Sequence, residues 1–216
     1  MILSISGLAR SGKDSIGDML VKKSGFKRIA MADILKEVVA NTMNLPLNNF
    51  HDDHLKDAPF QAPFIFDDGM AADLSFELNQ LGIDVTPSLF QSKLGVNFET
   101  PRHALIYIGT DVCRNLVDKD IWLNLTLDKI KKIEGHVVIT DARFKNEREA
   151  IKRIGGVTMF VDRPLVSEKF DASKAHESEL DQLNYSYDVM VINDRTLEAL
   201  QFEISAWLHA KPKTLR

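Results

Sequence analysis

The chain has 216 residues, a formal net charge of −4, a hydrophobic fraction of 44% and a charged fraction of 27%. This length suits one α/β domain with a sizeable core, and the composition is that of an ordinary globular protein. Because the net charge is slightly negative, no general field attracts polyanions. Neither a nucleic-acid polymer nor a membrane is therefore an expected partner.

Three features predict the compartment. Cys113 is the only cysteine and cannot form an internal disulfide, which is typical of a reducing environment. The N-terminal residues are expected to form the first strand, so we expect no secretory signal peptide. No apolar run has membrane-spanning length. Together these features predict a cytoplasmic protein, while the sequence leaves a homodimer open.

The first element is a strand at residues 1–6, followed by a glycine-rich turn and a helix that begins near Ser15. The turn, Gly7-Leu-Ala-Arg-Ser-Gly-Lys-Asp14, has the spacing G-x-x-x-x-G-K of a phosphate-binding loop. Glycines let the backbone approach an anion, successive N–H groups face it, and a lysine adds a mobile positive charge. The residues predicted to bind the phosphates of ATP are Gly7, Arg10, Ser11, Gly12 and Lys13.

The residue after Lys13 is Asp14, where phosphate-binding loops usually have Ser or Thr, and Ser15 follows it. A carboxylate is also a hard oxygen ligand for Mg²⁺. Asp14 is predicted to hold the metal, to hold a metal-bound water or to lie near the phosphoryl acceptor, and Ser15 is an alternative hydroxyl ligand. The structural alternative is a glycine turn before a helix, with Asp14 as a first-turn charge that the helix dipole favours.

The remaining elements are predicted from periodicity and from turn residues. We expect strands at 27–32, 136–141, 157–161 and 188–193, and helices at 33–40 (with Asp33 as a candidate cap), 71–82, 101–116, 121–133, 146–154 and 197–209. Residues 45–70 look irregular, with short helices at most, and residues 84–100 are ambiguous.

Strands that alternate with helices predict an α/β fold, a three-layer sandwich of the P-loop NTPase type with a mostly parallel sheet. Ligands in such sheets bind beyond the carboxyl ends of the strands. Asp141 ends a strand and is predicted to be a second Mg²⁺-organising carboxylate, with a turn residue as the alternative. Arg143 is predicted to reach a phosphate, or else to be a solvated arginine.

Arginines further along the chain are candidates for binding a second phosphate. Arg102 and Arg114 lie twelve residues apart in one predicted helix, a little over three turns, so their faces are expected to be similar. Arginine forks suit a monophosphate, and the alternative is a pair of surface arginines. Arg163 begins the polar segment 163–182, which predicts either a lid over ATP or a solvated loop.

Four segments resemble bacteriophage-type deoxynucleoside monophosphate kinases, within the P-loop NMP-kinase group. They are residues 7–15, Ala32-Asp-Ile-Leu-Lys-Glu37, Pro101–Asp111 with Arg114 and Asp120-Ile-Trp122, and Thr140-Asp-Ala-Arg-Phe-Lys-Asn-Glu147. With Arg163-Pro and His176-Glu-Ser-Glu they span almost the whole chain in order. Ile106 stands where the family pattern has Gln, and residues 45–100 resemble the family poorly.

The resemblance implies transfer of the γ-phosphoryl group of ATP to a deoxynucleoside monophosphate, which supplies DNA precursors. It implies a catalytic role for Lys13, Asp14 and Arg143, and Mg²⁺ organised by Asp14, Ser15 and Asp141. It also implies that ATP contacts Arg163. The residues implied on the acceptor side are Asp33, Lys36, Arg102, Arg114, Trp122, Asp141 and Arg143. Trp122 either stacks on or borders the base, or is a core residue.

The implied organisation is a single P-loop kinase domain over residues 1–216. Its core comprises 1–44 and 134–216, its acceptor-binding helical part 45–133 and its lid 163–182. Animal-type phosphomevalonate kinases also carry a Ser-Gly-Lys-Asp loop and dephospho-coenzyme A kinases share the architecture, so both are alternatives. A non-catalytic ATP-binding regulatory module is a third. If the chain is phage-encoded, the expected location is the host cytoplasm.

Overall fold

The structure, a computed structural model, describes residues 1–171, 173 and 177–210. Its contacts divide the chain into two compact units, Met1–Met31 with Lys129–Arg216 (unit 1) and Ala32–Asp128 (unit 2). The sequence placed the acceptor-binding part at 45–133, whereas unit 2 begins at Ala32. The reason is that the helix starting at Asp33 packs on helices of unit 2. His176, in the expected lid, lies outside the described residues.

Unit 1 is built on a parallel sheet whose strand order is β2-β5-β1-β6-β7. Each neighbouring pair of strands is parallel, so the carboxyl ends of all five lie at one edge. The strands are β1 (Ile2–Ser6), β2 (Phe26–Arg28), β5 (His136–Ile139), β6 (Val157–Asp162) and β7 (Val189–Ile192). The sheet confirms the predicted fold class.

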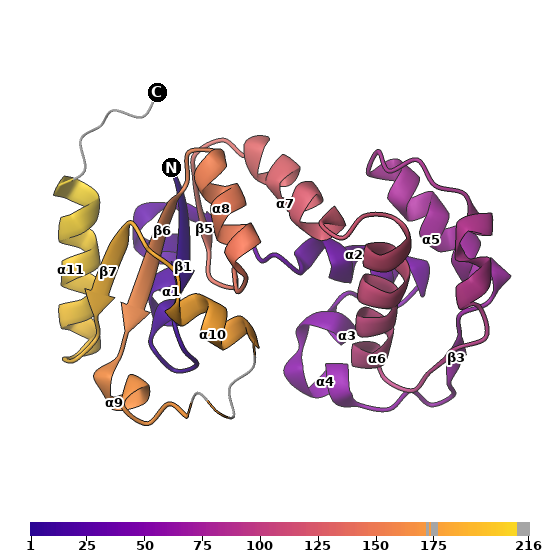
Figure 1. Cartoon of the computed structure of the whole chain (residues 1–216), viewed down its shortest axis with the longest axis horizontal. Coiled ribbons are helices and arrows are strands. Elements are labelled where there is room, and N and C mark those ends of the chain that lie inside the picture. Colours follow the sequence, from indigo (N-terminus) through magenta and orange to yellow (C-terminus); the bar gives the residue numbers. More distant parts are fainter. Residues whose placement is uncertain (172, 174–176, 211–216) are drawn as a thin grey trace. The chain divides into compact units, whose positions relative to one another are not determined.

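Helices cover both faces of this sheet (Figure 1). They are α1 (Lys13–Ser24), α8 (Lys145–Arg153), α9 (Pro164–Ser167), α10 (Glu177–Leu183) and α11 (Leu197–Ala210). Alternate strand residues such as Leu3, Ile5 and Met159 pack with α1 and α11 in one buried cluster. On the other face α8 buries Ala150 and Ile151. Among its described residues, the segment 163–182 contains α9 and most of α10.

Unit 2 is mainly helical and has its own apolar core. The core contains Phe50, Phe66, Phe90 and Phe98, all fully buried. The elements that begin in this unit are α2 (Asp33–Thr42), α3 (Asn48–His51), α4 (Asp53–Asp57), β3 (Phe64–Ile65), α5 (Asp68–Gln80), η1 (Pro87–Lys93), β4 (Asn97–Phe98), α6 (Pro101–Ile106), η2 (Tyr107–Arg114) and α7 (Ile121–Lys131). Strands β3 and β4 pair antiparallel.

Two local expectations for unit 2 were wrong. The helix expected over 101–116 is α6 followed by a π-helix, η2. A π-helix closes i→i+5 hydrogen bonds and has more residues per turn than an α-helix, so faces projected with 3.6 residues per turn do not apply there. Asp33 is the first residue of α2 rather than its cap, because Ala32 holds the cap position.

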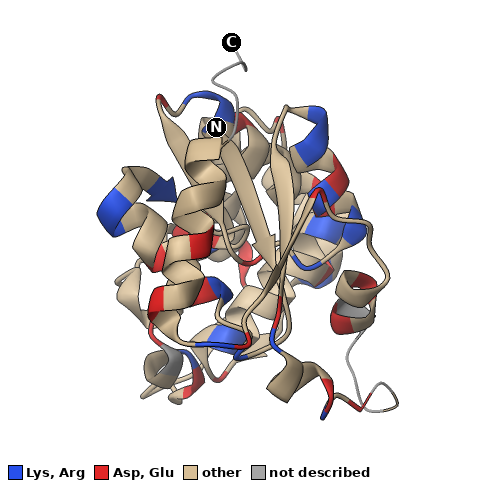
Figure 2. Cartoon of the chain, turned by 90° about the vertical axis from the view of Figure 1, so that its left-hand side faces the viewer, with Lys and Arg blue, Asp and Glu red and all other residues tan. Residues whose placement is uncertain are grey.

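On the side drawn in Figure 2, basic and acidic residues are interspersed along the helices and loops. Within the described part of the chain, no helix has both the length and the apolar character needed to cross a membrane.

Candidate active site

The glycine-rich turn joins β1 to α1 in the expected strand–turn–helix arrangement. Gly7 has a φ of 155°, and a Cβ there would lie 2.5 Å from Ser11 Oγ and 2.6 Å from the Val161 carbonyl oxygen. Gly12, with a φ of 104°, would place a Cβ 2.7 Å from Asn193 Nδ2. Larger residues at either position would force the turn open, so the sequence needs glycine at both.

The interior of this turn is fixed by one hydrogen bond within the turn and one from a distant residue. The amide of Ser11 donates to the Leu8 carbonyl (3.1 Å), and Asn193 Nδ2, just beyond β7, donates to the Ser11 carbonyl (2.8 Å). Ser11 Oγ is buried and has no hydrogen-bond partner within the structure. A phosphate oxygen is a suitable partner for such a hydroxyl, so this orphaned atom fits an anion in the turn.

A pocket of about 340 Å³ opens at the carboxyl edge of the sheet in unit 1. Its walls are three segments that are remote in sequence, namely the glycine turn, the loop after β5 and helix α10. The lining residues are Gly7, Leu8, Ala9, Lys13, Asp14, Thr140, Asp141, Ala142, Arg143, Glu179 and Gln182. Residues predicted to serve as phosphate ligands and as metal ligands therefore share one pocket.

Asp14 reaches this pocket, and Arg28 holds its carboxylate. Arg28 Nη2 donates to Asp14 Oδ1 (2.6 Å) and to Thr140 Oγ1 (2.7 Å), and Nη1 donates to Asp18 Oδ1 (2.8 Å). Lys13 Nζ lies 3.7 Å from Asp14 Oδ2. Arg28 was not predicted from the sequence, because its contacts depend on strand β2 lying beside β5.

Ser15 is exposed and is not among the pocket-lining residues. Of the two metal-ligand alternatives at the start of α1, the pocket geometry therefore favours Asp14.

Asp141 is the second carboxylate of the pocket. Its two carboxylate oxygens accept the Met31 amide N–H, at 3.0 Å for Oδ1 and 2.9 Å for Oδ2. This bond ties the loop after β5 to the end of the segment after β2.

Two carboxylates facing one pocket provide the oxygen donors that Mg²⁺ prefers. Among the described residues no group of three or more His, Cys, Asp or Glu side chains could enclose a metal ion. This donor set fits Mg²⁺, which keeps several waters and binds through one or two carboxylates together with substrate phosphates.

Arg143 lies at the pocket with an exposed side chain, and its backbone is held by Glu147. Glu147 Oε2 accepts the amides of Arg143 (2.6 Å) and Phe144 (3.0 Å) at the start of α8. Burial raises the pKa of Glu147, and these two backbone hydrogen bonds oppose the rise. The loop that presents Arg143 is thereby anchored to the first turn of a helix.

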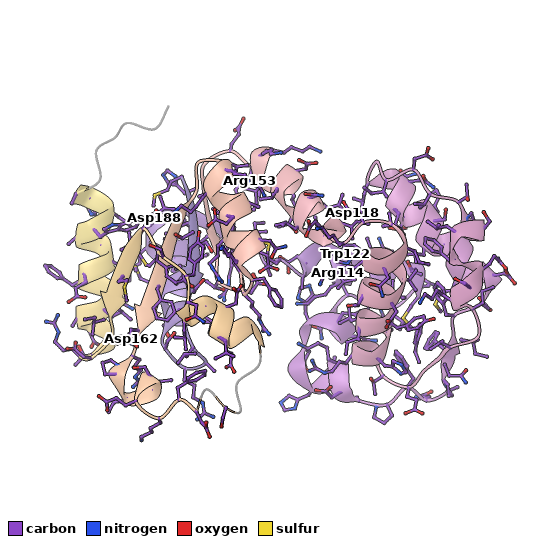
Figure 3. The ribbon with its side chains drawn as sticks, in the orientation of Figure 1. Arg114, Asp118, Trp122, Arg153, Asp162 and Asp188 are labelled. Carbon is purple, nitrogen blue, oxygen red and sulfur yellow. The ribbon has the colours of Figure 1, made fainter. Side chains whose placement is uncertain are left out.

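Arg10 and Arg163, both predicted to contact ATP, lie beside each other. Arg163 Nη1 donates to the Arg10 carbonyl oxygen at 3.3 Å. Arg10 has a φ of 64°, an uncommon conformation for a residue other than glycine. Arg10 lines a second pocket, of about 520 Å³, with Leu165, Lys169 and Phe170. Arg163 follows Asp162, which Figure 3 shows at the carboxyl end of β6.

The acceptor-side candidates belong to unit 2. Asp33 and Lys36 share the first turns of α2, and Lys36 Nζ lies 3.5 Å from His51 Nδ1. Burial lowers the pKa of His51 and the Lys36 charge lowers it further, whereas the Asp33 carboxylate opposes both. The structure thus places these candidates near the imidazole of His51.

Arg102 is bound by an acid in the same unit. Its Nε and Nη2 donate to the two carboxylate oxygens of Asp57, at 2.5 and 2.9 Å, which is a bidentate pair. The hydrogen bonds from Arg102 lower the pKa of Asp57. A phosphate that binds the Arg102 guanidinium must therefore either displace the Asp57 carboxylate or share the guanidinium with it.

Arg114 ends the π-helix η2, and its Nε donates to the Lys119 carbonyl oxygen at 2.9 Å. Figure 3 labels Arg114 and Trp122 near the junction of η2 and α7. The two arginine candidates of unit 2 therefore have separate partners, Asp57 for Arg102 and the Lys119 backbone for Arg114. Because η2 is a π-helix, the expectation that Arg102 and Arg114 lie on similar faces of one α-helix no longer follows from their spacing.

Trp122 is a core residue. Its side chain is 8% exposed, it packs in the apolar cluster of unit 2, and its indole N–H donates to the Gly109 carbonyl at 2.9 Å. The ring is packed in the core and its N–H, the only donor of the side chain, is bonded to Gly109. Of the two alternatives for Trp122, the structure therefore favours a core residue over a contact with the base.

The comparisons with known proteins identify the family. A parallel sheet with a glycine turn and a following lysine at its carboxyl edge defines the class of P-loop proteins. The model of the deoxynucleotide monophosphate kinase family matches residues 97–204, which is half of the chain. The protein therefore belongs to the deoxynucleotide monophosphate kinase family.

Individual relatives cover smaller parts. A protein of Acanthamoeba polyphaga mimivirus, described as a deoxynucleotide monophosphate kinase, is 32% identical over 49% of this chain and 59% of its own length. The deoxynucleoside-5′-monophosphate kinase of Escherichia phage T5 is 36% identical over 38% of this chain and 34% of its own. The matches thus span less than two thirds of either relative.

A solved structure of shikimate kinase from Aquifex aeolicus is also similar. It is 16% identical, the match covers 97% of this chain and 96% of that one, and the TM-score is 0.44. No functional conclusion follows from it.

Proposed function

We propose that this protein transfers the γ-phosphoryl group of ATP to a deoxynucleoside 5′-monophosphate. The observation that carries the proposal is the pocket in which Lys13 and Asp14 meet Asp141 and Arg143. The first two come from the phosphate loop, and the last two lie inside the segment that matches the family. Both relatives named above are described as deoxynucleotide or deoxynucleoside monophosphate kinases, which supports the same substrate class.

The reaction needs little covalent chemistry from the protein. An oxygen of the acceptor phosphate forms a bond to the γ-phosphorus while the bond between that phosphorus and the β,γ-bridging oxygen breaks, and ADP leaves with the electron pair. The acceptor phosphate is already ionised at neutral pH, so a strong general base is not required. Catalysis then depends on alignment and on neutralising charge.

The residues of unit 1 supply those two effects. The amides of the turn and the hydroxyl of Ser11 bind the β- and γ-phosphates, and Lys13 adds a positive charge beside them. Arg143 faces the same pocket and offsets negative charge that builds up as the phosphoryl group moves. Asp14 and Asp141 are the residues that would hold Mg²⁺, which when bound neutralises phosphate charge.

The residues of unit 2 supply the acceptor side. In this proposal Arg102 and Arg114 bind the phosphate of the deoxynucleotide, and Asp33 and Lys36 line the acceptor side. Such a reaction takes place where ATP and deoxynucleotides are available, in the cytoplasm of a cell or of an infected host.

A coupled assay of ADP release tests the proposal on the full chain. Each of the four common deoxynucleoside monophosphates is offered with ATP and Mg²⁺, next to phosphomevalonate and dephospho-coenzyme A. We expect turnover with one or more deoxynucleotides and none with the other two acceptors. Turnover with only a non-nucleotide acceptor would overturn the proposal. So would tight ATP binding, measured by calorimetry, without turnover of any acceptor, since that result would indicate a regulatory module.

A further inference from the structure

Arg148, in the middle of α8, is the largest fully buried side chain of unit 1. Its guanidinium carbon lies 4.5 Å from the ring centre of Tyr185 and 5.6 Å from that of Tyr187. Its Nε is buried and has no hydrogen-bond partner in the structure. Removing a guanidinium from water is costly, and an apolar residue of similar volume often serves stability as well or better. Core packing alone therefore does not explain this arginine.

The hydrogen bonds of Arg148 join two walls of the phosphate pocket. Nη1 donates to the carbonyl oxygen of Arg143, in the loop after β5 (2.8 Å). Nη2 donates to the carbonyl oxygen (2.9 Å) and to the carboxylate (3.3 Å) of Asp181, on α10. The Asp181 carboxylate also accepts the amide of Lys145 at the start of α8. One buried side chain thus holds α10 against the loop that carries Arg143.

Helix α10 in turn holds the phosphate loop. Gln182, the residue after Asp181, is 7% exposed, and its Oε1 accepts the Gly7 amide at 3.1 Å. Gly7 opens the glycine turn that Figure 1 shows at the carboxyl end of β1. The hydroxyl of Tyr187 donates to the Gln182 carbonyl at 3.0 Å and fixes this end of α10 as well. The position of the turn therefore depends on α10, and the position of α10 depends on Arg148.

We propose that Arg148 is a positioning residue that acts through α10, so that Gln182 holds the Gly7 amide and fixes the phosphate loop for ATP. Arg148 itself touches no substrate in this assignment. Of the measurements that test this proposal, only the KM for the deoxynucleotide rests on the proposed function.

The test compares Gln182→Met and Arg148→Lys with Arg153→Met, an exposed arginine at the end of the same helix. Methionine keeps the length of Gln182 but cannot accept the Gly7 N–H, and lysine keeps the charge of Arg148 but lacks its fork. We expect both variants to raise the Kd for ADP–Mg²⁺ by about 5- to 10-fold, the effect of one lost hydrogen bond. The KM for the deoxynucleotide should stay within about 2-fold, because only the loop moves. Arg153→Met should change neither.

Hydrogen exchange supplies a readout that does not require activity. Peptides covering residues 7–12 should exchange faster in Gln182→Met and in Arg148→Lys, and at the wild-type rate in Arg153→Met. The double variant Arg148→Lys with Gln182→Met should bind ADP as tightly as the weaker-binding of the two single variants. The effects do not add, because both changes break the same chain of contacts. A lower melting temperature in Arg148→Lys with unchanged ADP affinity and unchanged exchange of the loop would overturn the proposal. If the wild type phosphorylates no deoxynucleotide while the binding and exchange effects remain, the proposed function fails and this inference stands.

Discussion

Arg28 and Asp14 are joined by a 2.6 Å hydrogen bond that connects strand β2 to the first turn of α1. The same guanidinium reaches Thr140 at the end of β5. Gly17 makes this arrangement possible, because a Cβ there would lie 2.8 Å from Thr140 Cγ2 and 3.7 Å from the guanidinium carbon. An arginine outside the glycine turn therefore orients the carboxylate that replaces the usual hydroxyl after Lys13.

Replacing Arg28 with methionine should weaken the reaction without unfolding the protein. Asp14 would lose its fixed direction, and a hydrogen bond to a charged group contributes enough to expect a loss of about 10-fold in kcat/KM for ATP–Mg²⁺. The matched control is Asp18→Asn, which removes the other acid on Arg28, outside the pocket, and should change kcat/KM by less than about 2-fold. Equal losses in both variants would contradict a specific role for the Asp14 contact. Steady-state kinetics with varied ATP measures both.

Lys13→Ala should lower the rate by about 10²- to 10³-fold with the fold retained, because an aligned charge beside the transferring group stabilises the transition state far more than the ground state. The side chain is only 20% exposed, and its ion pair with Asp14 is long, at 3.7 Å, so little folding energy depends on it. Lys22→Ala, an exposed lysine in the last turn of the same helix, is the control. Circular dichroism should give similar spectra for all three proteins, and near-normal turnover in Lys13→Ala would refute the assignment.

Asp57→Asn should strengthen deoxynucleotide binding. Asp57 fills the Arg102 fork with a carboxylate, and the acceptor phosphate needs the same donors. The neutral amide competes less well, so the KM for the deoxynucleotide should fall by about 3- to 10-fold while the KM for ATP stays constant.

Two further variants make that test decisive. Arg102→Ala should raise the same KM, and Asp73→Asn, at an exposed position of α5 in the same unit, should leave it unchanged. An increase in the deoxynucleotide KM of Asp57→Asn would mean that Asp57 orients Arg102 and does not compete with phosphate.

The parts of the site that the sequence predicted are local. The glycine turn, Lys13 and Asp14 occupy consecutive positions, so strand, turn and helix follow from spacing alone. Asp141 and Arg143 were predicted at the same edge because parallel strands share their carboxyl ends. The pocket that joins these residues agrees with that reasoning.

The parts that the sequence did not predict depend on contacts between distant segments. Arg28, Arg148 and Gln182 belong to no short motif, and their partners are 14, 33 and 175 positions away. Nothing local distinguishes them from solvated polar residues. The π-helix η2 was missed for a related reason, since its apolar residues also fit a helical period of 3.6. Trp122 could be assigned only when the burial of its ring and the bond to Gly109 were known.

Trp122→Phe should lower stability and leave substrate binding unchanged. Phenylalanine keeps part of the packing but cannot donate to the Gly109 carbonyl, which is left without that partner. Together these losses should cost about 1–3 kcal/mol in the free energy of unfolding, measured by urea titration. The KM for each deoxynucleotide should remain within about 2-fold. A large rise in KM with unchanged stability would restore the base-stacking role.

Cys113 should be unreactive in the native protein. Its side chain is fully buried, and burial raises the pKa of the thiol to about 12. Because the thiolate is the reactive form, a disulfide reagent at pH 8 should label the native protein slowly and the urea-unfolded protein at once.

The raised pKa of Cys113 also makes the stability of the protein depend on pH. A thiol whose folded pKa lies above its unfolded value favours the folded state below about pH 9, and this advantage declines as pH rises toward 12. Cys113→Ala should therefore show a smaller loss of stability than the wild type between pH 9 and 11 in urea titrations. Rapid labelling of the native protein at pH 8 would contradict the burial on which both expectations rest.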